Sequence, residues 1–366
     1  MASQHFLGGL FPYLRLQIFV FVFRLLLRWR TAAHIRRDNA ILPLSEAGVR
    51  KQRIQLPSRE PGRFIVADLY LPSSHDGKDA LGKTPLPVLV NWHGSGFVFP
   101  LHGTDAYFCI RMARDAGIAV LDADYRKAPE HPYPAAIDDA EDALRWVASS
   151  PAARAAYNLD SGRVAVSGFS AGGHIAAVAA SYLKQKLESE AEGDLGGLKI
   201  QMLLSVYGSS DIATDATTKK PPSPSLRAHA PWILNMFADA YAPDPSTRTD
   251  PAVSPGFADP DAFPQTTAFL TCEGDNLRWE IETLVERLKE KGAVSKGLKE
   301  RRGMSITKCS RGCAMRLIRA SRRTGVAPSP GPGARRLMRG RRRCSKIRFA
   351  RSSDAVASLG AFALQT

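Results

Sequence analysis

The sequence predicts an α/β protein in which a mostly parallel central sheet is covered by helices. Short hydrophobic segments alternate with longer amphipathic ones from about residue 54 to residue 291. Hydrophobic residues make up 44% of the 366 residues, which is enough to form a large core. Such alternation is typical of parallel sheets, because each crossover between parallel strands usually contains a helix. Active sites in this architecture lie at the carboxyl ends of the strands.

The individual elements follow from runs of apolar residues and from their boundaries. The predicted strands are Phe64–Leu71, Pro87–Trp92, Ile118–Asp122, Arg163–Ser167, Leu198–Val206 and Thr267–Cys272. The predicted helices are Thr104–Ala116, 134–150, Ala171–Leu187 and Arg278–Lys291. The helix at 134–150 opens with Pro134, whose fixed φ suits a first turn. Asp138 and Asp139 follow near its N-terminus, where the helix dipole favours negative charge.

Residues 1–50 form an N-terminal segment with a strongly apolar stretch, Leu16–Leu27, that Arg24 interrupts. The uninterrupted run is shorter than the ~20 residues that cross a bilayer, and no clear signal peptide is present. Three interpretations stay open: a helix packed over the functional site, a peripheral membrane anchor through residues 6–30, or a spanning segment. The first two predict a cytoplasmic or peripherally membrane-associated protein.

Residues 208–262 interrupt the alternation of strands and helices. They contain Pro-rich sequence and one apolar helix, Pro231–Tyr241. An insertion between late strands is a common place for a lid over an apolar pocket, but an apolar helix can equally belong to the core. A small helical cap and a core helix therefore both remain open.

The clearest chemical signal is the pentapeptide Gly168–Gly172, which reads G-x-S-x-G. It lies between a predicted strand and a predicted helix, which is the context that a nucleophilic serine requires. Gly168 and Gly172 permit the sharp turn and bring the helix close. Ser170 then projects at a helix N-terminus, where developing negative charge is stabilised. The pattern indicates that Ser170 is a nucleophile.

A second glycine-rich stretch, His93–Gly96, follows the strand Pro87–Trp92. A serine that transfers acyl groups needs N–H donors aimed at the oxyanion of its tetrahedral intermediate. We expect the N–H groups of Gly94, Ser95 and Ala171 to supply them. We expect His93 to hold this loop by hydrogen bonding, and Gly96 to help expose its backbone.

Three ordered motifs, "HGSGF", "DYRKAPEHPYPAAIDDA" and "GFSAGG", resemble those of the hormone-sensitive-lipase-like α/β-hydrolases, particularly fungal esterase-type members. The resemblance covers about residues 50–291. It implies an α/β-hydrolase fold with a small helical cap, a carboxylic ester substrate, and a catalytic triad in the order Ser, Asp, His. The family's acid corresponds to Asp275 in "TCEGDNLRWE". Ser95 stands where the family usually has glycine, which is tolerable because only its backbone need donate.

The triad histidine is missing from the expected place. The chain has eight histidines: His5, His34, His75, His93, His102, His131, His174 and His229. None follows Asp275, and a serine without an imidazole is a weak nucleophile. His174 and His131 are not persuasive substitutes from their positions in the sequence. The chain is therefore expected to hydrolyse esters slowly or not at all.

Residues 292–366 differ in composition from the rest of the chain. Of the 50 Lys and Arg residues, 19 lie in this tail, which holds only two of the 35 acidic residues. The net charge of +15 thus belongs to the tail and not to the main domain. No apolar periodicity there predicts a final strand or helix. The tail is either disordered or mis-translated, or a genuine basic segment for nucleic acid or anionic membrane.

The number and spacing of the cysteines limit the possible cofactors. The five cysteines lack paired spacing, which argues against a disulfide framework and against a zinc site, and no metal or other cofactor is predicted. The expected partner is a small-molecule ester, with no specific nucleic acid, and the oligomeric state stays unknown. The favoured function is a serine carboxylic-ester hydrolase. The alternatives are a ligand-binding pseudoenzyme of the same fold, as in a plant hormone receptor branch of the family, and a membrane- or nucleic-acid-associated basic protein.

Overall fold

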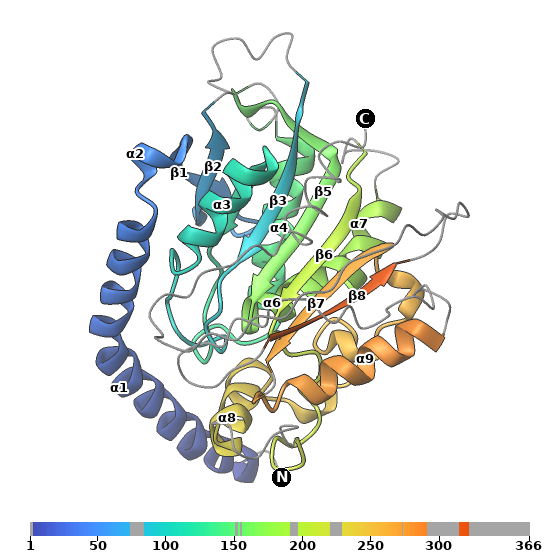
Figure 1. The fold of residues 1–366 in the computed structure, drawn as a ribbon. Helices are drawn as coiled ribbons and strands as arrows, with labels where there is room; N and C mark the ends of the chain where they lie inside the picture. Colours follow the sequence, from blue (N-terminus) through green and yellow to red (C-terminus); the bar gives the residue numbers. More distant parts are fainter. Residues whose placement is uncertain are drawn as a thin grey trace, which may run out of the picture.

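The computed structural model describes residues 3–73, 84–150, 153, 156–190, 197–219, 229–272, 274–290 and 315–321. Its centre is an eight-stranded sheet in the order β1-β2-β4-β3-β5-β6-β7-β8 (Figure 1). The strands are β1 Val49–Pro57, β2 Phe64–Pro72, β3 Leu86–Trp92, β4 Ala119–Ala123, β5 Leu159–Phe169, β6 Ile200–Val206, β7 Thr266–Cys272 and β8 Met315–Ser321. Strands β4, β3, β5, β6 and β7 run parallel, while β1, β2 and β8 add antiparallel pairs at the two edges. The predicted mostly parallel α/β fold is confirmed.

Helices cover both faces of this sheet. The main helices are α1 Ser3–Ile41, α2 Leu44–Ala47, α3 Ala106–Ala116, α4 Ala135–Ser149, α6 Ala171–Val178, α7 Lys184–Ser189, α8 Pro231–Tyr241 and α9 Arg278–Glu290. Helix α3 packs on one face, and α4, α6 and α9 pack on the other. The predicted helix Ala171–Leu187 continues from α6 into α7 through a π-helical turn, Ala179–Leu183. Pro231–Tyr241 is helical as predicted.

The long helix α1 lies along the outside of the domain, at the left of Figure 1. Its inward side reaches the loop after β3 and helix α8: Val20 is buried, and the Phe19 ring lies 5.7 Å from that of Trp232. Arg24 donates to the carbonyl oxygens of Val98 (2.8 Å) and Ala128 (2.9 Å). These contacts explain why a charge interrupts the apolar run, and they show α1 packed on the domain against α8 and the loop after β3.

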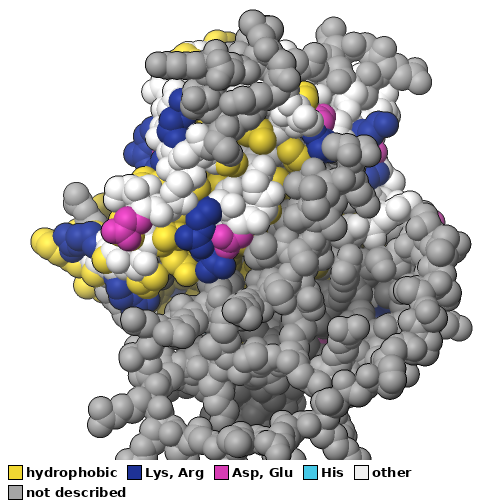
Figure 2. All heavy atoms as spheres, turned by 45° about the horizontal axis from the view of Figure 1, so that its top comes forward, with side chains coloured by type: hydrophobic (Ala, Val, Ile, Leu, Met, Phe, Trp, Pro, Cys, Tyr) yellow, Lys and Arg dark blue, Asp and Glu magenta, His cyan; other side chains and the backbone are white. Residues whose placement is uncertain are grey.

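The outward side of α1 is apolar. The exposed hydrophobic side chains of α1 are Tyr13, Leu14, Ile18, Phe21, Val22, Leu25, Leu26, Trp29 and Ile41. In the space-filling view, hydrophobic and basic side chains lie together at the left margin, where Figure 1 places α1 and α2 (Figure 2). Even so, no helix among the described residues, α1 included, combines the length and the apolar character that crossing a bilayer requires.

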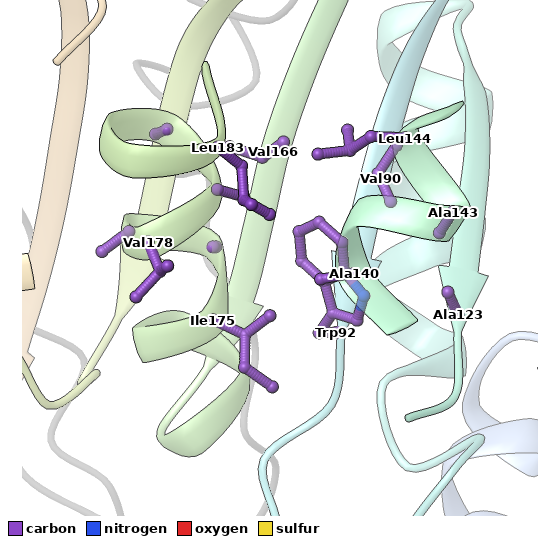
Figure 3. Close-up of a cluster of buried hydrophobic side chains, with 14 of the residues drawn as sticks. Val90, Trp92, Ala123, Ala140, Ala143, Leu144, Val166, Ile175, Val178 and Leu183 are labelled. Atoms are coloured by element: carbon purple, nitrogen blue, oxygen red, sulfur yellow. The ribbon is translucent and has the colours of Figure 1, made fainter. Parts of the chain in front are cut away.

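The core beneath the carboxyl ends of β3 and β5 fixes α4 and α6 against the sheet. Trp92, at the end of β3, is fully buried. Its indole lies between Ala140 of α4 and Ile175 of α6 (Figure 3). Small residues on α4 allow this close approach. The end of β3 and the start of α6 are thereby held in one rigid unit.

The two edges of the sheet were not predicted from the sequence. Strand β1 was not predicted, because its sequence, VRKQRIQLP, is largely polar and exposed as befits an edge. The tail was expected to hold no strand, yet Met315–Ser321 pairs antiparallel with β7. An unpaired β7 would leave a row of free backbone groups, and main-chain pairing satisfies them without requiring apolar periodicity. The other residues of the 292–366 tail lie outside the described part of the chain.

The acids near the start of α4 do more than face the helix dipole. Asp139 is fully buried and accepts hydrogen bonds from the backbone N–H (2.8 Å) and the Nε (3.1 Å) of Arg126. A second guanidinium, that of Arg63, also donates to this carboxylate. The carboxylate ties the segment after β4 and the loop before β2 to α4.

Replacing Asp139 by Asn should therefore destabilise the protein strongly. The substitution removes the buried carboxylate that Arg63 and Arg126 share, and because both guanidiniums keep their contacts with Glu60, the loss should be about 1–3 kcal/mol. The urea unfolding midpoint measures this loss. The exposed pair Glu286–Lys289 provides the control, because Glu286→Gln should leave the midpoint unchanged within error. Equal midpoints for Asp139→Asn and the parent protein would contradict the assignment.

Candidate active site

Ser170 stands at the sharp turn between β5 and α6. Its backbone has φ 52° and ψ −119°, a conformation that L-residues rarely adopt. The turn is possible because glycines flank it: a Cβ on Gly172 would lie 1.9 Å from the carbonyl oxygen of Trp92, and one on Gly168 would lie 2.2 Å from that of Gly172. The predicted strand, turn and helix around Ser170 are thus present.

The loop after β3 lies directly against this turn. A Cβ on Gly94 would lie 2.9 Å from the carbonyl oxygen of Phe169 and 3.3 Å from the Cβ of Ser170. Ala171 is the first residue of α6, so its N–H has no partner within the helix. Gly96 adopts φ 56° and lies against the ring of Phe237 on α8. The structure therefore brings Gly94, Ser95 and Ala171 together beside Ser170.

The loop is held by Tyr125 and not by the imidazole of His93. The Tyr125 hydroxyl donates to the carbonyl oxygen of His93 (2.8 Å), and the Ser95 hydroxyl donates to Tyr125 (2.6 Å). Neither ring nitrogen of His93 has a hydrogen-bond partner among the described residues, so the predicted hydrogen bond from this histidine is wrong. The ring instead stacks on Tyr125 at 4.8 Å. Burial lowers the pKa of His93 well below its usual range, which keeps it neutral.

A buried polar network lies at the end of β3, directly before the His93–Gly96 loop. Asn91 donates to Asp122 (2.9 Å) and accepts from the Ser167 hydroxyl (2.8 Å). Burial raises the pKa of Asp122 to about 6. Asp122, His102 and Asp68 lie close enough to share a cation. However, Asp68 is already paired with Lys51 (2.7 Å) and Arg53 (2.8 Å), and His102 Nε2 faces the Asp122 carbonyl oxygen (3.1 Å). These contacts fit a structural network better than a metal site.

Ser170 opens into a pocket, and concave, largely apolar pockets of this kind are the usual binding sites of small molecules. One side of the pocket is formed by the loop after β3 and the turn at Ser170. The opposite side is formed by α8 and the segment 211–219. The lining residues are Gly96, Phe97, Ser170, Ala171, Ser209, Asp211, Ile212, Thr214, Ala216, Lys219, His229, Leu234, Asn235, Phe237, Ala238 and Leu277. Lys219 is buried in an ion pair with Glu280 (2.5 Å), so its charge is neutralised. The pocket is mostly apolar without a free buried charge.

Asp275 lies in the turn between β7 and α9, beside the same pocket. Its carboxylate accepts a hydrogen bond from the N–H of Leu277 (3.0 Å), and its burial raises its pKa. Leu277 lines the pocket, which brings Asp275 close to the Ser170 side of the sheet. No described histidine joins Ser170 to Asp275 by hydrogen bonds. The sequence predicted that the triad histidine is missing, and the described residues likewise place no histidine in hydrogen-bond contact with Ser170 or Asp275.

The histidines singled out from the sequence do not fill this gap. His174 is fully buried, donates from Nδ1 to the carbonyl oxygen of Ser209 (3.1 Å), and packs against Phe97 and Tyr241. Burial lowers its pKa to about 4. His131 is exposed in the turn before α4. Neither lines the pocket. His229 does, and sequence reasoning missed it because no local motif marks a residue that reaches the site from the insertion.

Comparisons with known proteins agree with this geometry. Residues 89–305 match a family model described as the alpha/beta hydrolase fold. The chain is 35% identical over 252 residues to carboxylesterase NlhH of Mycobacterium tuberculosis, covering 63% of this chain and 73% of that protein. It is also 35% identical over 201 residues to the esterase LipI of the same species, covering 53% of this chain and 58% of that protein.

Solved structures give the same result. The hyperthermophilic esterase from the archaeon Pyrobaculum calidifontis aligns with a TM-score of 0.59 and 28% identity, covering 78% of this chain and 86% of that one. Its monoclinic form aligns at 0.58 with 30% identity, covering 75% of this chain and 80% of that chain. The strand order, the sharp turn at Ser170 and these matches all lead to one assignment: the chain belongs to the α/β-hydrolase fold family, as its three sequence motifs predicted.

Proposed function

We propose that this protein hydrolyses small, uncharged carboxylic esters through nucleophilic attack by Ser170. The observation that carries the proposal is the strained turn at Ser170, placed at the floor of an apolar pocket and against the Gly94 loop. The carboxylesterase and esterase names of the relatives support the reaction class. The pairing of Lys219 with Glu280 supports an uncharged substrate, because this ammonium group is not free to select an anionic one.

In this proposal, each residue around the turn at Ser170 has a role in the reaction. Ser170 Oγ attacks the carbonyl carbon, and the N–H groups of Gly94, Ser95 and Ala171 stabilise the resulting oxyanion. The start of α6 adds the positive end of its dipole at the same point. Asp275 is the acid that would orient an imidazole. The Tyr125 hydroxyl keeps the oxyanion loop in place by binding the His93 carbonyl oxygen.

The incomplete triad sets an expectation for the rate. Among the described residues, no hydrogen bond links the Ser170 hydroxyl to a base, so turnover should be well below that of a complete triad. The same feature favours the alternative of a ligand-binding pseudoenzyme, which would hold an ester in the pocket without cleaving it. Measured turnover of an ester decides between the two.

Ser170→Ala should abolish the hydrolysis of p-nitrophenyl acetate by the full-length protein, because the only nucleophile in the proposal is removed. The measurement is initial rate above the uncatalysed reaction. Ser149→Ala provides the control, since Ser149 is exposed on α4 and bonds only to the Arg145 carbonyl oxygen in the described structure. Undiminished hydrolysis by Ser170→Ala would refute the proposed function.

Gly94→Ala should lower kcat by about 10²–10³-fold, the usual cost of losing one oxyanion donor. The added methyl group would lie 2.9 Å from the Phe169 carbonyl oxygen and push the loop away from Ser170. Ser149→Ala, on the exposed surface of α4, serves as the control here as well. A Gly94→Ala protein with the parent kcat would remove Gly94 from the oxyanion site.

We also propose that the outward face of α1 binds the surface of an anionic membrane. Leu14, Ile18, Phe21 and Leu25 are each more than half exposed and recur at helical spacing along one side. Arg15 and Arg36 are exposed on the same helix and suit acidic headgroups. Because α1 also contacts α8, which lines the pocket through Leu234 and Phe237, the membrane would lie on the side of the domain that carries α8.

The double substitution Phe21→Ser/Leu25→Ser should weaken binding to phosphatidylglycerol-containing vesicles by at least about tenfold, since burying each such side chain contributes about 1.5–3 kcal/mol. Vesicle co-sedimentation measures the change. Trp279→Ser removes an exposed aromatic side chain on α9 and should have no effect. Equal sedimentation of the α1 variant and the parent protein would argue against this surface.

A further inference from the structure

We propose that His229, from the segment just before α8, is the general base that activates Ser170. The inference rests on the proposed function, because a base is needed only if Ser170 is the nucleophile. It replaces the arrangement implied by the family resemblance, in which the histidine follows the acid. The imidazole would instead reach the site from the insertion between β6 and β7.

The pocket places His229 with the other reacting groups. Ser170, Ala171 and Leu277 line one side of the pocket, and His229 and Leu234 line it from the cap segment. Leu277 is also the residue whose N–H binds the Asp275 carboxylate. Among the described histidines, His229 is the one that borders this pocket. It therefore shares a single small cavity with both the nucleophile and the neighbour of the acid.

Charge connects His229 to Asp275 as well. Burial raises the pKa of the Asp275 carboxyl, and the nearby imidazolium of His229 lowers it. A carboxylate that stabilises an imidazolium is the usual partner of a general base. Within the described residues, the carboxylate accepts only the hydrogen bond from Leu277, so its second oxygen is available to an imidazole.

The other basic group in the pocket cannot accept a proton. The Lys219 ammonium donates to Glu280 (2.5 Å) and to the carbonyl oxygen of Asp211. Glu280 also accepts from the backbone N–H of Ser210 (2.6 Å) and holds the ion pair in place. Deprotonating Lys219 would leave the Glu280 charge buried and unpaired, which is costly. His229, in contrast, is exposed to solvent and can exchange its proton.

The steps then balance in protons and electron pairs. The Ser170 O–H bond breaks, its proton moves to a ring nitrogen of His229, and Oγ bonds to the ester carbonyl carbon. The carbonyl electron pair becomes the oxyanion beside Gly94 and Ala171. When the intermediate collapses, the leaving alcohol takes the proton from His229. Water next gives a proton to His229 and attacks the acyl carbon, and Ser170 recovers its proton as the acid leaves.

We expect an imidazole carried by the segment before α8 to be positioned less precisely than one fixed at a strand end. No hydrogen bond joins His229 to Ser170 or Asp275 in the unliganded pocket, although such bonds often form only with substrate bound. We therefore expect turnover that is low but that depends on both Ser170 and His229. This dependence separates the inference from a chain that has no base.

The test compares His229→Ala with the parent full-length protein in p-nitrophenyl acetate hydrolysis between pH 5 and pH 9. We expect kcat to fall by about 10²-fold, the usual contribution of a general base. Added imidazole should restore part of the rate, and the decline of kcat/KM toward acid pH should disappear. His131→Ala is the matched control, because His131 is equally exposed but lies outside the pocket. The exposure of His229 means that its removal should not disturb folding, which circular dichroism checks.

The outcomes for the base and for the nucleophile are distinct. If Ser170→Ala is inactive while His229→Ala keeps the parent rate, the inference falls and the proposed function stands. If Ser170→Ala keeps the parent rate, the proposed function itself fails. A folded parent protein without any Ser170-dependent turnover would overturn the inference and favour the pseudoenzyme. A loss in His229→Ala that imidazole restores, with His131→Ala unchanged, supports it.

Discussion

The close contact between the first turn of α6 and the end of β3 determines most of this structure. Gly172 lies so near the Trp92 carbonyl oxygen that a Cβ would approach it to 1.9 Å, so any other residue would push the helix away from the sheet. This contact forces the chain through the positive φ of Ser170 and brings the Gly94 loop against the turn. Ser170 and the proposed oxyanion donors are therefore placed by one packing constraint, and Trp92 is buried between α4 and α6 next to it (Figure 3).

The opposite side of the pocket is formed by α8, which α1 in turn contacts from the outside of the domain. Helix α8 supplies Phe237 against Gly96, and α1 packs on α8 through Phe19 and Trp232. Arg24 fixes α1 to the same loop by hydrogen bonds to backbone carbonyl oxygens. These contacts are fewer than those of the sheet, and regions with few buried contacts open at lower free-energy cost. A cap of this kind can admit an ester and can also bring a side chain such as His229 toward the site.

In the proposed mechanism, the acid and the base come from separate parts of the fold. Asp275 keeps its place at the end of β7, while the chain after it holds no histidine. Catalytic groups act through their geometry and not through their order in the sequence, and similar triads are assembled in several chain orders. A base that arrives from the cap would couple turnover to cap position. The positions of Asp275 and of the Gly94 loop would not change with the position of that segment.

The sequence by itself determined the alternating fold, the turn at Ser170, the glycine loop and the place of Asp275, because each depends on neighbouring residues whose periodicity and backbone freedom are local. It also predicted the helix Pro231–Tyr241 but not its position on the pocket. Only the tertiary structure decided that Tyr125 holds the loop instead of His93, that Arg24 binds backbone carbonyls, and that Met315–Ser321 completes the sheet edge. It alone placed His229 and Ser170 in the lining of one pocket. These are contacts between distant segments, which depend on how the whole chain packs and leave no mark in local sequence.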